Sequence, residues 1–345
     1  MAGTGTAHLR DASEALLRVE DLVVEFRSGR KQKVHAVTEV NLDVLPGETL
    51  GLVGESGCGK STTGKAIMQL PPPTSGRVVF DGTDLTQLSG NDLRQVRTQV
   101  QMIFQDPISS LNPRRKVEEI IAEGLDIWKV GTKEERAAKV DEMLLTVGMD
   151  PEVAKGRRPF QFSGGQCQRI SIARAVITEP KLIVCDEPVS ALDVSVQAQI
   201  LNLLEDMKAQ YGLTMIFIAH DLAVVKNISD RVAVMYLGRL CEVGDPDVLY
   251  AQPAHPYTAA LLSAIPVPDP TVRPDTRQTL GGEIPSPLAP PSGCRFRTRC
   301  PRADQVCKDQ VPEMTEVAPH QYVACHHPIA PGESVASVEL AGARA

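Results

Sequence analysis

The sequence of 345 residues contains no apolar run long enough to span a bilayer and no surplus of positive charge. We therefore expect no transmembrane helix. The N-terminal sequence MAGTGTAHLRDASE also lacks the apolar h-region of a secretory signal peptide. A net charge of −7 and a pI near 5.6 argue against a protein that binds nucleic acid through its phosphates. The sequence predicts a soluble cytoplasmic protein with an ordinary globular core.

A glycine-rich loop, GESGCGKST, follows the apolar sequence GETLGLVG and precedes STTGKAIMQL, which has the character of a helix. This strand–loop–helix context is typical of a Walker A phosphate loop, in which backbone N–H groups surround phosphate oxygens. Lys60 is expected to reach the β- and γ-phosphates, and the Ser61 hydroxyl to bind Mg²⁺. The alternative is a glycine-rich turn without a ligand. The expected ATP contacts are Gly54, Ser56, Gly57, Cys58, Gly59, Lys60, Ser61 and Thr62.

Two adjacent carboxylates end a second apolar segment, KLIVCDEP at Lys181 to Pro188. Its short apolar run is typical of a buried central strand, and open α/β sheets place ligand-binding groups at the carboxyl ends of their strands. Asp186 is expected to hold Mg²⁺ through water, and Glu187 to polarise the water that attacks the γ-phosphate. The alternative is a pair of solvated acids at the end of a strand.

The sequences SGGQCQRISIARAV and DEPVSALD, with His220 after the apolar run LTMIFIA, resemble the ATP-binding subunits of ABC transporters. The resemblance covers about residues 17–330. It implies that Gln105 senses Mg²⁺ and the attacking water, and that His220 contacts the γ-phosphate. Phe26 is the candidate for stacking on adenine, with a place in the core as the alternative. The signature residues are Ser163, Gly164, Gly165 and Gln166, and the D-loop is Ser190 to Asp193.

The signature sequence precedes ISIARAV, which has helical character, so a second helix N-terminus is available for phosphate. In the family that this sequence resembles, the signature closes on the ATP of a partner subunit. The resemblance therefore implies two ATP molecules sandwiched in a head-to-tail dimer. Phe162 replaces the usual leucine and Cys167 a polar or basic residue, but neither change removes a phosphate contact.

The resemblance and the pattern of elements predict an α/β fold, a RecA-like P-loop NTPase core with an antiparallel β subdomain and an inserted α-helical subdomain. The sequence from Leu17 to Phe26 alternates as an edge strand would. A proline-rich composition shift near residue 266 marks the start of a small appended module with clustered cysteines. The expected segments are a flexible tail at 1–16, the nucleotide-binding domain at 17–250 with its helical subdomain at about 107–178, the C-terminal extension at 251–330 and a flexible tail at 331–345.

The sequence has no closely spaced C-x2-4-C pair, yet four of its eight cysteines fall within the C-terminal extension. Structural zinc sites usually contain such a pair, disulfides are not expected in the cytoplasm, and four thiolates can hold an iron–sulfur cluster with irregular spacing. We expect a 4Fe–4S cluster that stabilises the module, with Zn²⁺ or four reduced buried cysteines as alternatives. Its ligands are Cys294, Cys300, Cys307 and Cys325, spare ligands are His255, His320, His326 and His327, and positive charge comes from Arg295, Arg297, Arg299 and Arg302. Cys58, Cys167, Cys185 and Cys241 are interpreted as ordinary small side chains.

The C-terminal sequences HPYTAALLSAIP and GEIPSPLAPPSGCRFRTRCPRADQVC resemble the extension of dipeptide, oligopeptide and nickel importer ATPases. QDPISSLNPR resembles the F-type subunit, which pairs with a D-type ATPase. The resemblance implies peptide import together with two transmembrane permease subunits and an extracytoplasmic substrate-binding protein. It places this chain at the cytoplasmic side of the inner membrane. Alternatives are import of nickel, glutathione or another small solute, a non-transport ABC ATPase, and a redox-sensing or nucleic-acid-binding role for the module.

Overall fold

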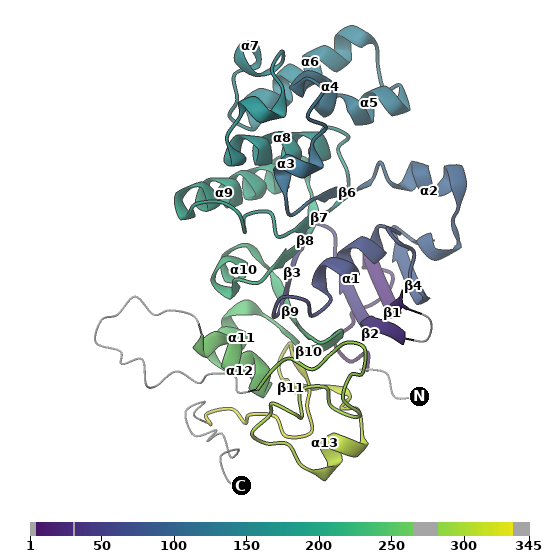
Figure 1. Ribbon diagram of the computed structural model, residues 1–345, viewed down its shortest axis with the longest axis vertical. Helices are drawn as coiled ribbons and strands as arrows, with labels where there is room; N and C mark the ends of the chain where they lie inside the picture. The colour runs from purple at the N-terminus through teal and green to yellow at the C-terminus, as the bar shows by residue number, and fades with distance from the viewer. Residues whose placement is uncertain (1–4, 30–31, 265–281, 334–345) are drawn as a thin grey trace, which may run out of the picture. The chain divides into compact units, whose positions relative to one another are not determined.

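The computed structural model describes residues 5–29, 32–264 and 282–333, which belong to two compact units (Figure 1). The first unit lies within Met1–Leu45, Thr49–Gln87 and Ala219–Ala345, and the second within Pro46–Glu48 and Leu88–Ile218. The proline-rich segment that begins near residue 266, and most of the predicted C-terminal tail, lie outside the described residues. Among the described residues, no helix has the length and apolar character needed to cross a membrane.

An antiparallel sheet of the first unit has the strand order β2-β1-β4-β5. Residues of β1 alternate between buried and partly exposed positions, as one covered face requires. However, β1 pairs with β2 on one side and with β4 on the other, so the predicted edge position is wrong. The strands are β1 (Leu17–Ser28), β2 (Gln32–Val44), β4 (Ser75–Phe80) and β5 (Thr83–Asp84).

The phosphate-loop strand β3 (Thr49–Val53) is parallel to β9 (Arg231–Tyr236), as predicted for a strand buried on both faces. A hairpin joins β9 to β10 (Arg239–Gly244), and β12 (Gln321–Ala324) pairs with β10. β11 (Met314–Ala318) completes this side of the sheet. The C-terminal extension is therefore hydrogen-bonded directly to the strands of the first unit. The helices of this unit are α1 (Lys60–Ile67), α10 (Leu222–Ile228), α11 (Pro246–Ala251), α12 (Pro256–Ser263) and α13 (Gln305–Asp309), with a 3-10 turn at Leu85–Gln87.

A buried carboxylate joins the first part of the extension to β10. The Glu242 side chain accepts hydrogen bonds from the Ala254 and His255 amides, at 2.8 and 2.9 Å, and from Gln321 Nε2 at 2.8 Å. Burial raises the pKa of Glu242, against the hydrogen bonds that lower it. His255 in turn caps α12, because its Nδ1 accepts from the Tyr257 amide at 3.0 Å. One carboxylate thus fixes both the start of α12 and strand β12.

In the second unit, β6 (Val100–Ile103), β7 (Leu182–Asp186) and β8 (Thr214–Ala219) run parallel, with β7 in the middle. All residues of β7 and β8 are buried, so the prediction of a central strand before Asp186 is confirmed. Helices α3, α4, α6 and α9 all contact α8. The helices are α2 (Gly90–Val96), α3 (Pro107–Ser110), α4 (Val117–Ile121), α5 (Glu123–Trp128), α6 (Lys133–Thr146), α7 (Pro151–Ala154), α8 (Gly164–Val176) and α9 (Val194–Tyr211), with a 3-10 turn at Pro159–Gln161.

Part of the segment predicted as an N-terminal tail has specific contacts. His8 is 2% exposed, and its Nε2 lies 2.7 Å from the carbonyl oxygen of Asn41. Arg10 donates to the buried carboxylate of Asp43 at 2.6 Å. Residues 5–16 therefore contribute packing to the antiparallel sheet.

We predict that His255 makes the protein sensitive to acid. Burial lowers the pKa of His255 from 6.5 to about 3. Between these two pH values, the unfolded chain therefore binds a proton at His255 that the folded chain does not bind. The stabilisation is complete above pH 6.5 and is lost as the pH falls toward 3. Between pH 7.5 and pH 5 we expect a loss of about 2 kcal/mol in the free energy of unfolding from this residue. Denaturant unfolding of wild type and His255→Asn at both pH values measures it, since asparagine can still cap α12. Equal pH dependence in the two proteins would contradict the assignment.

Candidate functional site

The phosphate loop between β3 and α1 has a backbone that requires glycine at two close contacts. Gly54 has φ of 149°, and a Cβ there would lie 2.1 Å from the Met235 carbonyl oxygen. Gly59 has φ of 110°, and its Cβ would lie 2.4 Å from the Ala36 carbonyl oxygen. Both the dihedral angles and the neighbouring carbonyls exclude a side chain. The loop is therefore held in one shape by the strands around it.

Lys60 begins α1 and lies inside this loop. Its side chain is 4% exposed, and Nζ donates to the carbonyl oxygens of Gly54 at 2.7 Å and Glu55 at 3.0 Å. Ser56 and Gly57 are exposed at the tip of the loop, whereas the Cys58 side chain is buried. Burial raises the pKa of Cys58 despite the nearby Lys60. Ser61 and Thr62 occupy the first turn of α1. The predicted ATP-binding residues thus form a loop and a helix N-terminus around the positively charged side chain of Lys60. Such an arrangement can bind an anion.

The second unit brings Gln105 and Glu187 together, although they are 82 residues apart in the chain. Each follows one of the neighbouring parallel strands β6 and β7, so both lie at the same edge of the sheet. Gln105 Nε2 donates to Glu187 Oε2 at 2.9 Å, and the Glu187 amide donates to the Ile218 carbonyl at 2.9 Å. Asp186 is 2% exposed at the end of β7.

Glu187 has φ of 47°, in the left-handed region that costs a non-glycine residue free energy. Such strained residues cluster at functional sites, where surrounding contacts hold them. The following D-loop contributes to this support, because the Ser190 hydroxyl donates to the Glu187 carbonyl at 3.1 Å. Hydrogen bonds within this unit thus hold both the side chain and the backbone of Glu187.

The signature residues form the N-terminus of α8. The Ser163 hydroxyl accepts from the Gln166 amide at 3.4 Å, and Gln166 Oε1 accepts from the Ser163 amide at 3.0 Å, which together make a capping box. Ser163 and Gln166 are exposed, while Gly164 and Gly165 are partly exposed. Cys167 is buried and its thiol donates to the Pro159 carbonyl, so it is not exposed together with Ser163 and Gln166.

Two further predicted residues lie in the first unit. His220 is exposed directly after β8 and before Asp221, which caps α10. Phe26 is 40% exposed on β1, opposite Val34 of β2, so it is not a core residue. The phosphate loop also belongs to this unit, whereas Gln105, Asp186, Glu187 and Ser163 belong to the second.

The four clustered cysteines approach one another in the C-terminal module, residues 282–333. For every pair among the four, the charge of one thiolate raises the pKa of another. Burial is the larger cause, and it raises the pKa of Cys300 to about 11 and that of Cys325 to about 12. The backbone also joins these segments, since the Cys294 amide donates to the Cys307 carbonyl at 2.8 Å. A segment with few buried apolar residues thus brings four thiols close together.

Cys241 is a fifth member of this neighbourhood that sequence reasoning missed. It lies on β10, lines a small cavity of about 20 Å³ together with Cys294 and His255, and is 7% exposed. Burial raises its pKa well above the usual value, with Cys294 and Cys325 among the further causes. Nothing in the local sequence signals this, because Cys241 is more than 50 residues from the nearest of the four.

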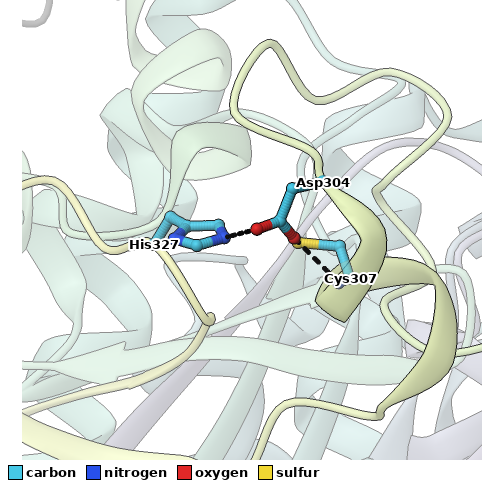
Figure 2. A group of neighbouring side chains, drawn as sticks. All are labelled: Asp304, Cys307 and His327. Atoms are coloured by element: carbon cyan, nitrogen blue, oxygen red, sulfur yellow. Dashed lines mark hydrogen bonds and ion pairs between the residues drawn. The ribbon is translucent and has the colours of Figure 1, made fainter.

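Asp304, Cys307 and His327 form a small polar group that shares Cys307 with the four clustered cysteines (Figure 2). Their candidate ligand atoms lie within 4.8 Å of one another, a spacing compatible with a single metal ion. Asp304 Oδ2 is 2.9 Å from His327 Nε2, and Oδ1 accepts from the Cys307 amide at 3.1 Å. The carboxylate thus caps α13 and orients His327.

Two segments of the chain match known protein families. Residues 37–190 match the family described as ABC transporter, and residues 241–307 match the oligopeptide/dipeptide transporter C-terminal region. Oligopeptide transport ATP-binding protein AppF of Bacillus subtilis (strain 168) is 51% identical over 322 residues, 91% of this chain and 97% of that protein. The chain belongs to the ABC transporter ATP-binding proteins.

Further similarities agree with this ABC ATPase assignment. Oligopeptide transport ATP-binding protein OppF of Salmonella typhimurium (strain LT2) is 53% identical over 310 residues, 87% of this chain and 92% of that protein. A dimeric ATP-binding cassette in a post-hydrolysis state with ADP and Pi is 28% identical, with a TM-score of 0.61 over 67% of this chain and 98% of that chain. The predicted α/β P-loop NTPase fold and the predicted family are confirmed.

For this ABC ATPase, we predict that Gly59→Ala is more damaging than Gly57→Ala. Both residues have positive φ, which costs an alanine about 1–2 kcal/mol. Only Gly59 also faces a backbone carbonyl at 2.4 Å, whereas a Cβ at Gly57 meets nothing within 4 Å. Thermal unfolding and binding of a fluorescent ATP analogue should both be impaired more in Gly59→Ala. Indistinguishable variants would show that the contact with Ala36 does not restrict the loop.

Proposed function

We propose that this chain is the ATP-binding and hydrolysing subunit that powers import of di- or oligopeptides by an ABC transporter. The observation that carries the proposal is its similarity to AppF and OppF, which are named as oligopeptide transport proteins, over almost their whole lengths. The match of residues 241–307 to the oligopeptide/dipeptide C-terminal region supports the same cargo. Nickel, glutathione or another small solute is the alternative cargo.

The phosphate loop is proposed to hold the triphosphate of ATP. Its backbone amides and the N-terminus of α1 supply partial positive charge, and Lys60 supplies a full charge for the β- and γ-phosphates. Lys60 must then exchange the Gly54 and Glu55 carbonyls for phosphate oxygens. Ser61, Gln105 and Asp186 are the proposed ligands or sensors of Mg²⁺. Bound Mg²⁺ supplies the positive charge that stabilises the developing charge on the γ-phosphoryl group.

Glu187 is proposed as the general base that orients and polarises the attacking water. The hydrogen bond from Gln105 supports this role, because it orients the Glu187 carboxylate at the carboxyl end of β7. His220 is proposed to contact the γ-phosphate, and Phe26 to stack on adenine from its exposed position on β1. The strained backbone of Glu187 is consistent with a catalytic role, because such strain lowers stability and is found mostly at functional sites.

The signature is proposed to act on the ATP of a partner subunit. The exposed N-terminus of α8, capped by Ser163, supports this, because Gly164 and Gly165 present amides that an incoming triphosphate can reach. The proposed partner is a D-type ATPase in a head-to-tail heterodimer. Two transmembrane permease subunits would hold the pair at the cytoplasmic face of the inner membrane, with an extracytoplasmic binding protein delivering the cargo.

We predict that Glu187→Gln binds ATP but hydrolyses it roughly 100-fold or more slowly, the range typical of a lost general base. In the reconstituted transporter, the variant should also lose ATP-driven uptake of a labelled oligopeptide. ATPase rate, ATP affinity and peptide uptake are measured together.

The matched control is Glu205→Gln, an exposed carboxylate on α9. Near-normal turnover in Glu187→Gln would refute its assignment as the base. Wild-type vesicles that take up nickel or glutathione but no peptide would overturn the proposed cargo while leaving the ATPase assignment intact.

A second proposal concerns the four clustered cysteines, for which we favour a 4Fe–4S cluster. Their mutual charge effects and their partial burial support a common site, since four neighbouring thiolates need a cation to offset their charge. Arg297 and Arg302 lower the pKa values of Cys294 and Cys300 respectively. A cluster would supply folding energy to a module with few buried side chains. The alternative is Zn²⁺ on the Asp304, Cys307 and His327 group.

Purification without oxygen is expected to give brown protein with about four iron atoms per chain. Cys325→Ala should lose the iron, whereas Cys167→Ala, a buried cysteine of the second unit, should retain it. Colourless protein with stoichiometric zinc would contradict the cluster. An ATPase rate that is unchanged by reduction and oxidation would identify the cluster as structural and exclude a redox sensor.

A further inference from the structure

Arg299 of the C-terminal module forms an ion pair with the phosphate loop. Its two terminal nitrogens donate to the two carboxylate oxygens of Glu55, at 2.7 and 3.1 Å, so the pair is bidentate. The side chains are 4% and 21% exposed, which separates this contact from an ordinary surface pair. An arginine guanidinium keeps its charge in proteins. The two hydrogen bonds therefore hold a charged group aligned with the Glu55 carboxylate.

Hydrogen bonds also hold the backbone of Glu55. Its amide donates to the Tyr257 hydroxyl at 2.8 Å, and its carbonyl accepts from Lys60 at 3.0 Å. Tyr257 is fully buried against Tyr236 and Phe296, with ring centroids 4.7 and 5.4 Å away. Tyr257 and Arg299, which follow Glu55 by 202 and 244 residues, thus hold its backbone and its side chain.

A second arginine of the module supports the loop indirectly. Arg295 donates to the Leu237 carbonyl and, at 2.9 Å, to the Thr38 hydroxyl. The next residue of that turn, Gly238, donates its amide to the Cys58 carbonyl of the phosphate loop at 2.7 Å. Arg295 and Arg299 lie on either side of the buried Phe296 in the sequence. This short segment therefore contacts Glu55 directly and supports Cys58 through the turn that contains Gly238.

We infer that Arg299 is a positioning residue for nucleotide binding, through which the C-terminal module holds the phosphate loop in its ATP-receptive shape. The inference rests on the proposed role of the phosphate loop in ATP binding, and it is independent of whether the module binds a metal. Because coupling between two sites is reciprocal, bound ATP must also stabilise the module. The module is thereby a part of the nucleotide site and more than an appendage to it.

The test measures ATP affinity in the full-length chain with Arg299→Ala, Glu55→Ala and the double variant. Networks of this kind change coupling by amounts that correspond to roughly threefold to thirtyfold in affinity, so each single variant should bind ATP that much more weakly. The double variant should lose little more than either single variant. Arg299→Lys keeps the charge without the planar fork and should recover part of the affinity.

Lys308→Ala is the matched control, because it removes an exposed positive charge from the same module without touching the loop. Metal content is measured in every variant, so that a loss of metal is distinguished from a loss of positioning. Hydrogen exchange of residues 292–302 supplies a second readout. ATP should slow this exchange in wild type and in Lys308→Ala but not in Arg299→Ala, a difference that a merely structural role would not produce.

Wild-type ATP affinity in both Arg299→Ala and Glu55→Ala would overturn the inference, as would additive losses in the double variant. If Arg299→Ala fails to fold, Arg299→Lys and Glu55→Gln carry the same comparison. Normal ATP binding by Lys60→Ala would instead refute the proposed phosphate loop itself, so the two failures are distinguishable.

Discussion

The phosphate loop passes so close to its neighbours that it constrains their sequence as well as its own. Gly54 and Gly59 face backbone carbonyls of other strands at distances that admit no Cβ. If the loop presents its inner N–H groups to an anion, as we propose, the Cys58 carbonyl and the Glu55 carboxylate need donors from outside the loop. The Gly238 amide and Arg299 are those donors. The strands and the C-terminal module are therefore arranged around the hydrogen bonds that this loop requires.

The parts of the site that the sequence predicts are those determined by local pattern. The sequence predicts a helix after the signature, and α8 begins there with Ser163 and Gln166 in a capping box. It also predicts that Asp186 ends a strand, as it does in β7. The buried character of β7 is likewise evident from its continuous apolar run. The sequence pattern therefore predicts these elements well, together with the fold class.

The parts that sequence could not predict depend on pairing between distant segments. Alternation in β1 is the same for an edge strand and for a central antiparallel strand, and only the strands on either side distinguish them. Arg299 and Glu55 are 244 residues apart, and no periodicity relates them. The sequence predicts Arg299 as positive charge for a metal cluster, whereas in the structure its charge is paired with Glu55. Cys241 reaches the cysteine cluster only because β10 carries it there.

The C-terminal module has few buried apolar residues, so its position must be fixed by stronger and more directional contacts. Arg295 and Arg299 are buried, and a buried guanidinium is costly unless it has acceptors in good geometry. Those acceptors lie on the phosphate loop and on the turn after β9, outside the module itself. Folding of the module is thus incomplete without the loop, and the loop lacks its outer donors without the module. A ligand that binds the loop and a metal that binds the cysteines would then stabilise the same packed state, because each lowers the free energy of the arrangement on which the other depends.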